Sequence, residues 1–205
     1  MRTFIGLAFA VTTASSFAIT AVWAQPWNPV TKLPAWTSGV VSCANPLPAR
    51  RMCFDDFRIA TPTQISMISF WGTVSNPTQL NRVMRISIHT NNAATCRPNQ
   101  AAIWSFCGVI PQKIGIGPDC QNRPVFRFNL PTGPALPVGQ YWLCVAEDDS
   151  LSYRPNGIAD FGWSAFQPMR FCPAIAYNSN ATVNQPLIDP CNQQRDDLSF
   201  NLYKP

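Results

Sequence analysis

Short segments in which apolar and polar residues alternate recur along this chain, and no helical segment separates them. Alternation with a period of two is typical of a β-strand with one buried face. It is clearest in Arg82 to His89 (RVMRISIH) and recurs in Pro124 to Leu130 (PVFRFNL). Gln140 to Ala146 (QYWLCVA) is almost wholly apolar, so we expect a central strand covered on both faces.

Four further segments are predicted strands: Cys53 to Ile59, Ile65 to Trp71, Phe161 to Phe166 and Asp197 to Tyr203. The chain also has 20 prolines and many Asn, Gln, Ser and Thr, which favour turns over helices. Repeated strands joined by such turns predict an all-β, antiparallel sandwich or barrel rather than an α/β sheet.

The ordered segments CFDDF, ISFWG, RISIH, LPVG followed by QYWLCV, and DDLSFNLY carry a resemblance. Together they resemble the jelly-roll β-sandwich domains of bacterial secreted proteins and are loosely similar to carbohydrate-binding modules. The resemblance implies a jelly-roll-like fold far more than a ligand. The eight cysteines depart from the pattern of those domains.

The segment 1–24 (MRTFIGLAFAVTTASSFAITAVWA) is typical of a secretory signal peptide. Arg2 supplies the positive start, Phe4 to Ala21 the apolar stretch, and Val22 and Ala24 the small-residue pair before the cleavage point. We therefore expect a protein secreted to the extracellular space or the periplasm.

The mature chain is expected to begin near Gln25, and residues 25–45 contain three prolines and two tryptophans. Prolines disfavour helices and central strands, whereas Trp27 and Trp36 offer large apolar surfaces. We expect an extended N-terminal arm that packs on its own domain or docks on a second copy, followed by a single β-sandwich domain over residues 46–205.

The charge and hydropathy patterns exclude two classes of partner. The formal net charge is +5, but the basic residues are scattered, and Arg50-Arg51 is the only adjacent pair. Nucleic-acid binding needs a clustered basic footprint, so we expect no nucleic-acid partner. After the expected signal peptide no apolar run is long enough to span a bilayer.

Cysteines in an exported chain usually form disulfides. The sequence contains no CxxC motif, so it gives no sign of a zinc site or a redox site. We expect all eight to be disulfide-bonded: Cys43, Cys53, Cys96, Cys107, Cys120, Cys144, Cys172 and Cys191. Pairing of neighbours predicts Cys43 with Cys53, Cys96 with Cys107, Cys120 with Cys144, and Cys172 with Cys191.

Two pairs of aspartates lie near the ends of the predicted sandwich, Asp55-Asp56 and Asp196-Asp197. If the terminal strands are neighbours, oxygens from both pairs could bind one structural calcium ion, which takes six to eight oxygen ligands. The alternative is that these aspartates pair with nearby arginines or cap turns.

A hydrolytic site finds little support. His89 is the only histidine and is expected on the polar, half-exposed face of its strand. GWSAF at 162–166 begins like a nucleophile elbow but ends in Phe rather than Gly. Adjacent strand carboxyls point to opposite faces, so a glycosidase pair would need carboxyls from separate strands.

Carbohydrate binding needs an aromatic face and nearby planar polar groups. The candidate ligand-binding residues are Trp104, Tyr153, Trp163, Arg154 and Asn156. Arg97 and Asn99 add polar groups beside Trp104. The leading hypothesis is thus a secreted, non-catalytic binding or adhesion module for extracellular glycans. The alternatives are a structural subunit of an extracellular layer or appendage, and a carboxylate-dependent hydrolase.

Overall fold

The computed structural model describes residues 19–40, 51–74, 83–148, 161–178, 185–190 and 192–205. Within these ranges the chain contains strands and no helix, which confirms the predicted all-β class. It follows that the described residues include no helix long and apolar enough to cross a membrane.

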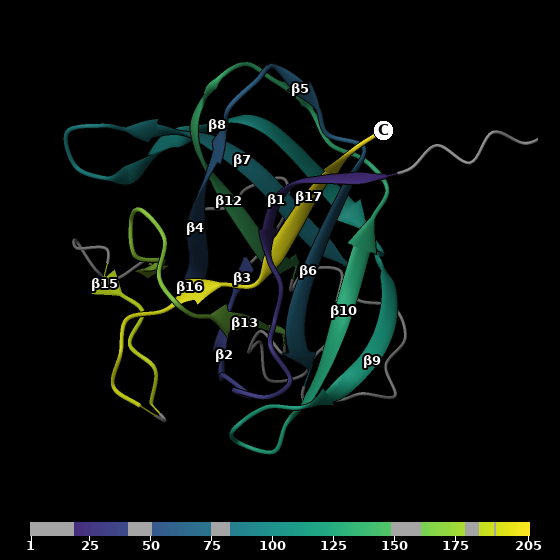
Figure 1. Cartoon of the computed structure of the whole chain (residues 1–205), viewed down its shortest axis with the longest axis vertical. Coiled ribbons are helices and arrows are strands. Elements are labelled where there is room, and N and C mark those ends of the chain that lie inside the picture. Colours follow the sequence, from purple (N-terminus) through teal and green to yellow (C-terminus); the bar gives the residue numbers. More distant parts are fainter. Residues whose placement is uncertain (1–18, 41–50, 75–82, 149–160, 179–184, 191) are drawn as a thin grey trace, which may run out of the picture.

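Two sheets form the body of the protein and lie face to face (Figure 1). The first has the order β1-β17-β6-β10-β9, and β13 also pairs with β6, β2 and β16. Its strands are β1 (Thr20–Gln25), β2 (Ala35–Thr37), β6 (Met67–Val74), β9 (Gln112–Pro118), β10 (Pro124–Leu130), β13 (Phe161–Phe166), β16 (Asp197–Leu198) and β17 (Phe200–Lys204).

The second sheet has the order β15-β14-β4-β3-β12-β7-β8, and β4 also pairs directly with β12. Its strands are β3 (Gly39–Val40), β4 (Arg51–Ile59), β7 (Met84–Asn92), β8 (Arg97–Val109), β12 (Gly139–Asp148), β14 (Ile175–Asn178) and β15 (Gln185–Pro186). Two short strands, β5 (Thr63–Gln64) and β11 (Ala135–Leu136), form a separate ladder. The ladders are antiparallel except for the one between β12 and β3. The finer jelly-roll assignment remains a prediction.

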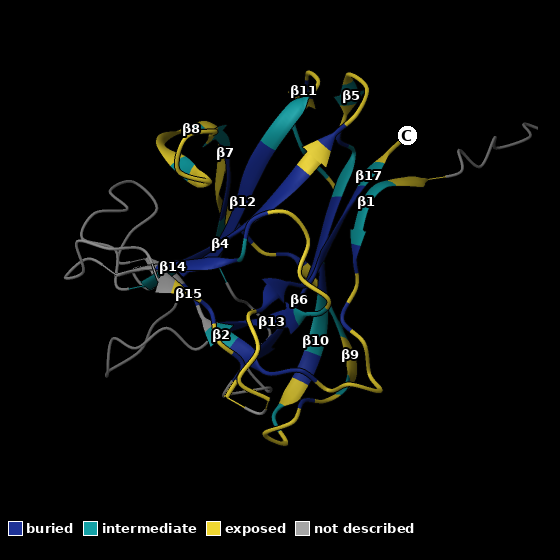
Figure 2. Cartoon of the chain, turned by 60° about the vertical axis from the view of Figure 1, so that its left-hand side comes forward, coloured by how far each residue is buried: buried dark blue, intermediate teal, exposed yellow. Residues whose placement is uncertain are grey.

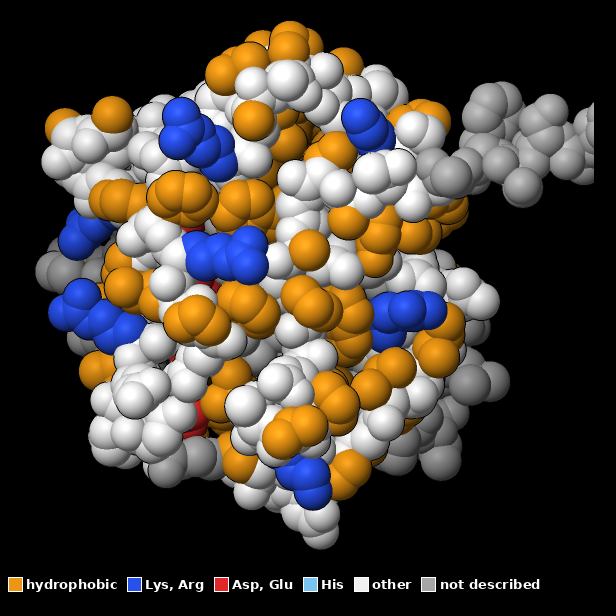
Figure 3. Space-filling view, viewed as in Figure 1, with side chains coloured by type: hydrophobic (Ala, Val, Ile, Leu, Met, Phe, Trp, Pro, Cys, Tyr) orange, Lys and Arg blue, Asp and Glu red, His pale blue; other side chains and the backbone are white. Residues whose placement is uncertain are grey.

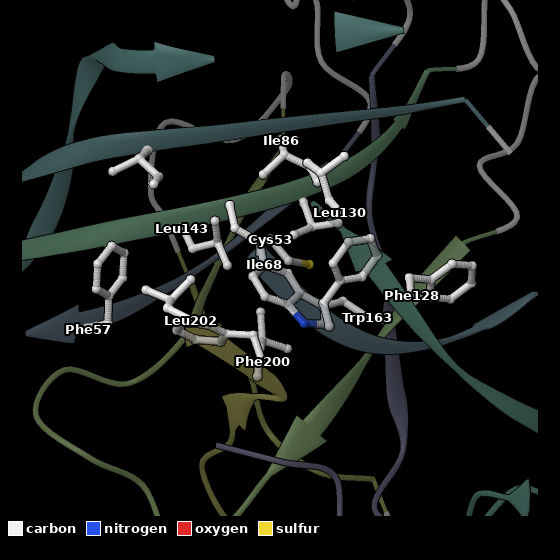
Figure 4. Close-up of a cluster of buried hydrophobic side chains, with 14 of the residues drawn as sticks. Cys53, Phe57, Ile68, Ile86, Phe128, Leu130, Leu143, Trp163, Phe200 and Leu202 are labelled. Atoms are coloured by element: carbon white, nitrogen blue, oxygen red, sulfur yellow. The ribbon is translucent and has the colours of Figure 1, made fainter. Parts of the chain in front are cut away.

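The main core lies between the two sheets. Figure 4 shows Phe57 and Leu143 of the second sheet pointing toward Leu202 and Phe200 of the first. The strand β12 lies between β4 and β7, and every residue from Tyr141 to Asp148 is buried (Figure 2). An unbroken apolar sequence thus marks a strand that is covered on both faces, as expected.

Smaller clusters cover the outer faces of both sheets. On the second sheet, Phe54, Trp142 and Cys144 pack with Cys172 and Ile175. This cover explains why the supposedly polar face of β7 is also buried. His89 is only 6% exposed, so its predicted half-exposed position is wrong.

The described residues nearest the N-terminus, 19–40, contribute strands to both sheets. Trp27 packs against Trp71 and Val125 on the outer face of the first sheet, while Trp36 packs against the main core. The segment Thr20–Gln25, expected in part to belong to the signal peptide, forms β1 and pairs with β17. Residues 25–40 of the expected arm therefore lie against their own domain.

Candidate functional site

Two acidic pairs from opposite ends of the chain meet inside the protein. Asp55 and Asp56 lie on β4, Asp197 lies on β16, and Asp196 precedes it. All four have 0% exposure. The backbone amide of Leu198 donates a hydrogen bond of 2.7 Å to Oδ2 of Asp55. The four aspartates singled out in the sequence therefore form one buried carboxyl cluster.

Neutral side chains donate hydrogen bonds to this carboxyl cluster. The indole Nε1 of Trp36 and the amide Nε2 of Gln167 donate to Asp196, at 3.1 and 2.9 Å. The amide Nε2 of Gln25 donates to Oδ2 of Asp197 at 3.2 Å. These donors carry no formal charge, so the arrangement differs from the aspartate–arginine pairing weighed as the alternative.

The remaining hydrogen bonds from described residues leave two carboxyl oxygens of the cluster without a donor. Gln140 Nε2 donates to Oδ2 of Asp56, and the backbone amide of Arg170 donates to Oδ2 of Asp197. Among the described residues, Oδ1 of Asp56 and Oδ1 of Asp197 find no hydrogen-bond partner. A buried, unpaired carboxylate oxygen is costly, and protonation reduces that cost.

Burial raises the pKa of every member of the carboxyl cluster. It raises the pKa of Asp56 to about 6 and those of Asp196 and Asp197 to about 7. Burial and then repulsion from Asp197 raise the pKa of Asp55 well above its ordinary value. Since like charges cannot all ionise together in a buried site, the cluster retains protons near neutral pH.

The calcium ion considered for the four aspartates stays a prediction. Among the residues that the structure describes, no group of three or more His, Cys, Asp or Glu side chains is placed to hold a metal ion. The four aspartates converge, and several of their oxygens accept hydrogen bonds from amide and indole donors, whereas Oδ1 of Asp56 and Oδ1 of Asp197 have no hydrogen-bond partner among the described residues. On the face shown in Figure 3, acidic atoms are visible only in narrow recesses, whereas Lys and Arg side chains stand on the surface.

The residues considered for hydrolysis are enclosed. The two ring nitrogens of His89 lie 3.0 Å from Ser87 Oγ and 2.9 Å from the carbonyl oxygen of Asn99. The ring of Phe54 meets the imidazole edge-on, with 5.3 Å between centroids. Ser164, from the GWSAF segment, has 0% exposure. These groups act as parts of the packed interior.

The prediction that Trp163 binds a sugar is wrong. Trp163 has 0% exposure and lies in the main core, where its Nε1 donates a hydrogen bond of 2.9 Å to the carbonyl oxygen of Ser199. It cannot stack on an external sugar ring. Tyr153, Arg154 and Asn156 lie outside the described residues.

Trp104 has a different environment, at the free edge of the second sheet. It lies on β8, pairs with Ile88 of β7 and is only partly buried. Its indole stacks on Phe106, with 6.2 Å between ring centroids and 13° between ring planes. Phe106 is 43% exposed, so one ring of this aromatic pair is open to solvent.

Phe106 was absent from the sequence-based candidates, although its position two residues after Trp104 was a usable signal. Residues i and i+2 of a strand share a face, so two aromatic residues at this spacing predict neighbouring rings. The signal was weak because 97–109 lacks regular alternation and contains Pro98 and Gly108. The strand β8 was consequently not predicted.

The disulfide predictions require correction. Cys96 is bonded to Cys172, with 6.0 Å between Cα atoms, which excludes the predicted Cys96–Cys107 and Cys172–Cys191 pairs. Cys107 and Cys120 are also disulfide-bonded. Cys53 and Cys144 are buried thiols, which excludes Cys43–Cys53 and Cys120–Cys144. Cys43 and Cys191 lie outside the described residues.

The disulfide joins positions that neighbour pairing does not connect. The hairpin of β7 and β8 (Figure 1) carries Cys96 to the outer face of the second sheet, where Cys172 lies in the cluster with Phe54 and Trp142. The spacing of cysteines in the sequence does not show that Cys96 and Cys172 lie close together, because their proximity depends on the order of strands in the sheet.

No protein-family model matches this chain, and no curated protein or solved structure shows significant similarity to it.

Proposed function

We propose that this chain is a secreted, non-catalytic binding module that recognises extracellular oligosaccharides through the edge strand β8. The observation that carries the proposal is the stacked pair of Trp104 and Phe106, which holds a flat aromatic surface partly open at the free edge of a sheet. Aromatic faces of this kind suit the apolar faces of sugar rings.

The polar groups along the same strand favour an extended ligand over a single sugar. Asn99 lies five positions before Trp104, which corresponds to about 16 Å along a strand. Asn99 Nδ2 already donates a hydrogen bond of 2.7 Å to Thr90 Oγ1, and Arg97 is exposed at the start of β8. A saccharide lying along β8 would have to span several rings to reach both the aromatic pair and these polar groups.

A glycan array with the oxidised, secreted protein, run in calcium and again in EDTA, tests this proposal. We expect binding that strengthens with oligosaccharide length and persists in EDTA. Trp104→Ala and Phe106→Ala should each weaken binding at least tenfold. The matched control is Ile103→Ala, because Ile103 is an apolar residue of the same strand that is 50% exposed and takes no part in the stacked pair. Unchanged binding in both aromatic variants would reject the site.

A second candidate function is a structural subunit that assembles through the same edge. The strand β8 is 13 residues long, ends the sheet order and exposes Ile103 and Phe106. Long apolar edges of this kind can pair with a strand of another molecule. Its test is the mass in solution across a range of concentrations: association that Ile103→Lys abolishes would favour assembly, and a constant monomer would favour the glycan-binding module.

A further inference from the structure

The strand β1 is a complete element of the first sheet. It pairs antiparallel with β17, from Thr20 opposite Lys204 to Gln25 opposite Phe200, with one irregularity between Ala21 and Trp23. It forms an outer strand of the sheet order, so it covers the edge of β17 (Figure 1). Cleavage immediately before Gln25 would remove five of its six residues.

Side chains fix β1 in place as well as its backbone. The ring of Trp23 stacks on Phe171 with 5.8 Å between centroids, and the guanidinium of Arg170 lies 5.5 Å from the Trp23 ring. Trp23 Nε1 donates a hydrogen bond of 2.6 Å to the side-chain oxygen of Gln25. The residues just before the first expected cleavage point are therefore part of the tertiary structure.

Gln25 is a poor position for a chain terminus. It has 0% exposure, and its backbone N–H donates a hydrogen bond of 3.1 Å to Oδ1 of Asn201. Cleavage at this point would replace that amide with an α-ammonium group in a buried position. Burial of a charge is costly unless it is paired, although the nearby carboxylate of Asp197 would offset part of that cost.

The sequence offers a second exit for a signal peptide, six residues earlier. Ser16 and Ala18 are a small-residue pair of the kind that precedes cleavage, equivalent to Val22 and Ala24. The apolar segment before this earlier exit, Phe4 to Val11, falls within the usual span of about 7 to 15 residues. The stretch from Phe4 to Ala21 that the later exit requires is longer than this span.

We propose that the export peptidase hydrolyses the peptide bond between Ala18 and Ile19, so that the mature protein begins at Ile19 and keeps all of β1. Water adds across the amide bond, Ala18 gains a carboxylate and Ile19 gains a free amine. The proposal rests on the expected secretory signal, and it is independent of any ligand. Ile19 is 56% exposed, as suits a chain terminus beside the first strand.

The test is the intact mass and N-terminal sequence of the full chain after export from a host with a secretory pathway. The expected mature chain begins with Ile19-Thr20-Ala21. A chain beginning at Gln25 would overturn the proposal, and so would an exported chain that retains Met1. Both results would leave secretion and the glycan-binding proposal intact, whereas a chain that stays inside the host with Met1 in place would remove the secretory premise.

Matched variants distinguish the two exits. A large residue immediately before the scissile bond hinders cleavage, so Ala18→Leu should abolish the species that begins at Ile19. Ala24→Leu should leave that species unchanged, because N-terminal sequencing reads the cleavage point whether or not the variant folds well. The opposite pattern, with loss only in Ala24→Leu, would assign the cleavage to the later exit.

Discussion

Asp55 accepts a hydrogen bond of 2.7 Å from the backbone amide of Leu198, 143 positions later in the chain. This contact brings the acids of β4 beside those that lead into the last strand. Burial and mutual repulsion then raise the pKa of Asp197 to about 7. The closing of the sandwich and the protonation of its buried acids are therefore linked.

The first prediction concerns stability and pH. The folded protein binds protons at Asp56, Asp196 and Asp197 up to about pH 6 to 7, whereas the unfolded chain releases them near the ordinary pKa of 3.8. Between about pH 4 and 7 the folded state therefore holds more protons, and the free energy of unfolding falls as pH rises. Asp197→Asn should remove part of this loss, with a gain of roughly 1–3 kcal/mol at pH 8 relative to pH 4.

Urea unfolding of the parent and Asp197→Asn at pH 4, 6 and 8 measures this difference. The two proteins are compared at each pH because His89 also makes stability depend on pH. Burial lowers the pKa of His89, so the free energy of unfolding falls as the pH drops below about 6.5, opposite to the effect of the buried aspartates. The control is Asp119→Asn, which breaks an ion pair of 2.8 Å with Arg123 and should destabilise the protein at pH 8. An equal effect of Asp197→Asn at all three values would contradict the prediction.

Most of the core could be predicted from sequence, because a strand that buries one or both faces leaves a readable pattern. Pro124–Leu130 and Phe161–Phe166 have the predicted bounds, and the apolar strand around Trp142 is central as expected. The edge strands β8 and β9 were missed, since residues exposed on both faces are under no constraint to alternate.

The candidate site was predictable only in part. The acidic pairs could be placed together because Asp55-Asp56 lies near the start of the predicted sandwich and Asp196-Asp197 near its end, but their partners, such as Gln25 and Trp36, come from the segment 25–45 that was expected to form an extended arm. Trp163 was predicted to bind a ligand because the sequence does not show that its strand lies between β2 and β6 and is buried there.

The disulfide between Cys96 and Cys172 should contribute substantially to stability. It closes a loop with a sequence separation of 76, and cross-links of this length typically stabilise by about 2–4 kcal/mol. Replacing both cysteines by Ala should lower the free energy of unfolding by that amount, as measured by urea denaturation without reductant. A double variant as stable as the parent would show that the bond does not form in the secreted protein.

The thiols of Cys53 and Cys144 should be inert in the folded protein. Burial raises the pKa of each to about 12, and the thiolate is the reactive form. An alkylating reagent at pH 8 should leave both unmodified in the native state and modify both in denaturant without reductant, as read by peptide mass spectrometry. Recovery of either residue in a disulfide-linked peptide would contradict the assignment.

Gly72 should tolerate no side chain. A Cβ atom there would lie 2.3 Å from Cε2 of Phe161 and 2.5 Å from the carbonyl oxygen of Gly162, where β6 and β13 pair. Gly72→Ala should destabilise the protein by about 1–3 kcal/mol through overpacking. Gly115→Ala is the matched control, because its nearest neighbour would be a Phe126 ring carbon at 3.8 Å. Equal melting temperatures for the two variants would refute this account of the contact.

Substitutions of Trp163 should mainly lower stability, whereas substitutions of Trp104 should mainly weaken glycan binding. Trp163→Ala removes a fully buried indole and leaves the carbonyl of Ser199 without its donor, so we expect a loss of about 3–5 kcal/mol. Trp104→Ala removes a partly buried ring at an edge and should cost less than half as much. Thermal unfolding and glycan binding, measured on both variants, form the test.

The decisive comparison is between the thermal stability and the glycan binding of each variant. Trp163→Phe should keep most of the core volume and bind glycans like the parent, because this position contacts only other parts of the protein. Trp104→Ala should stay folded and lose binding, because the indole supports the exposed ring of Phe106. If Trp163→Phe stayed folded but lost glycan binding while Trp104→Ala retained it, the ligand surface would lie away from β8.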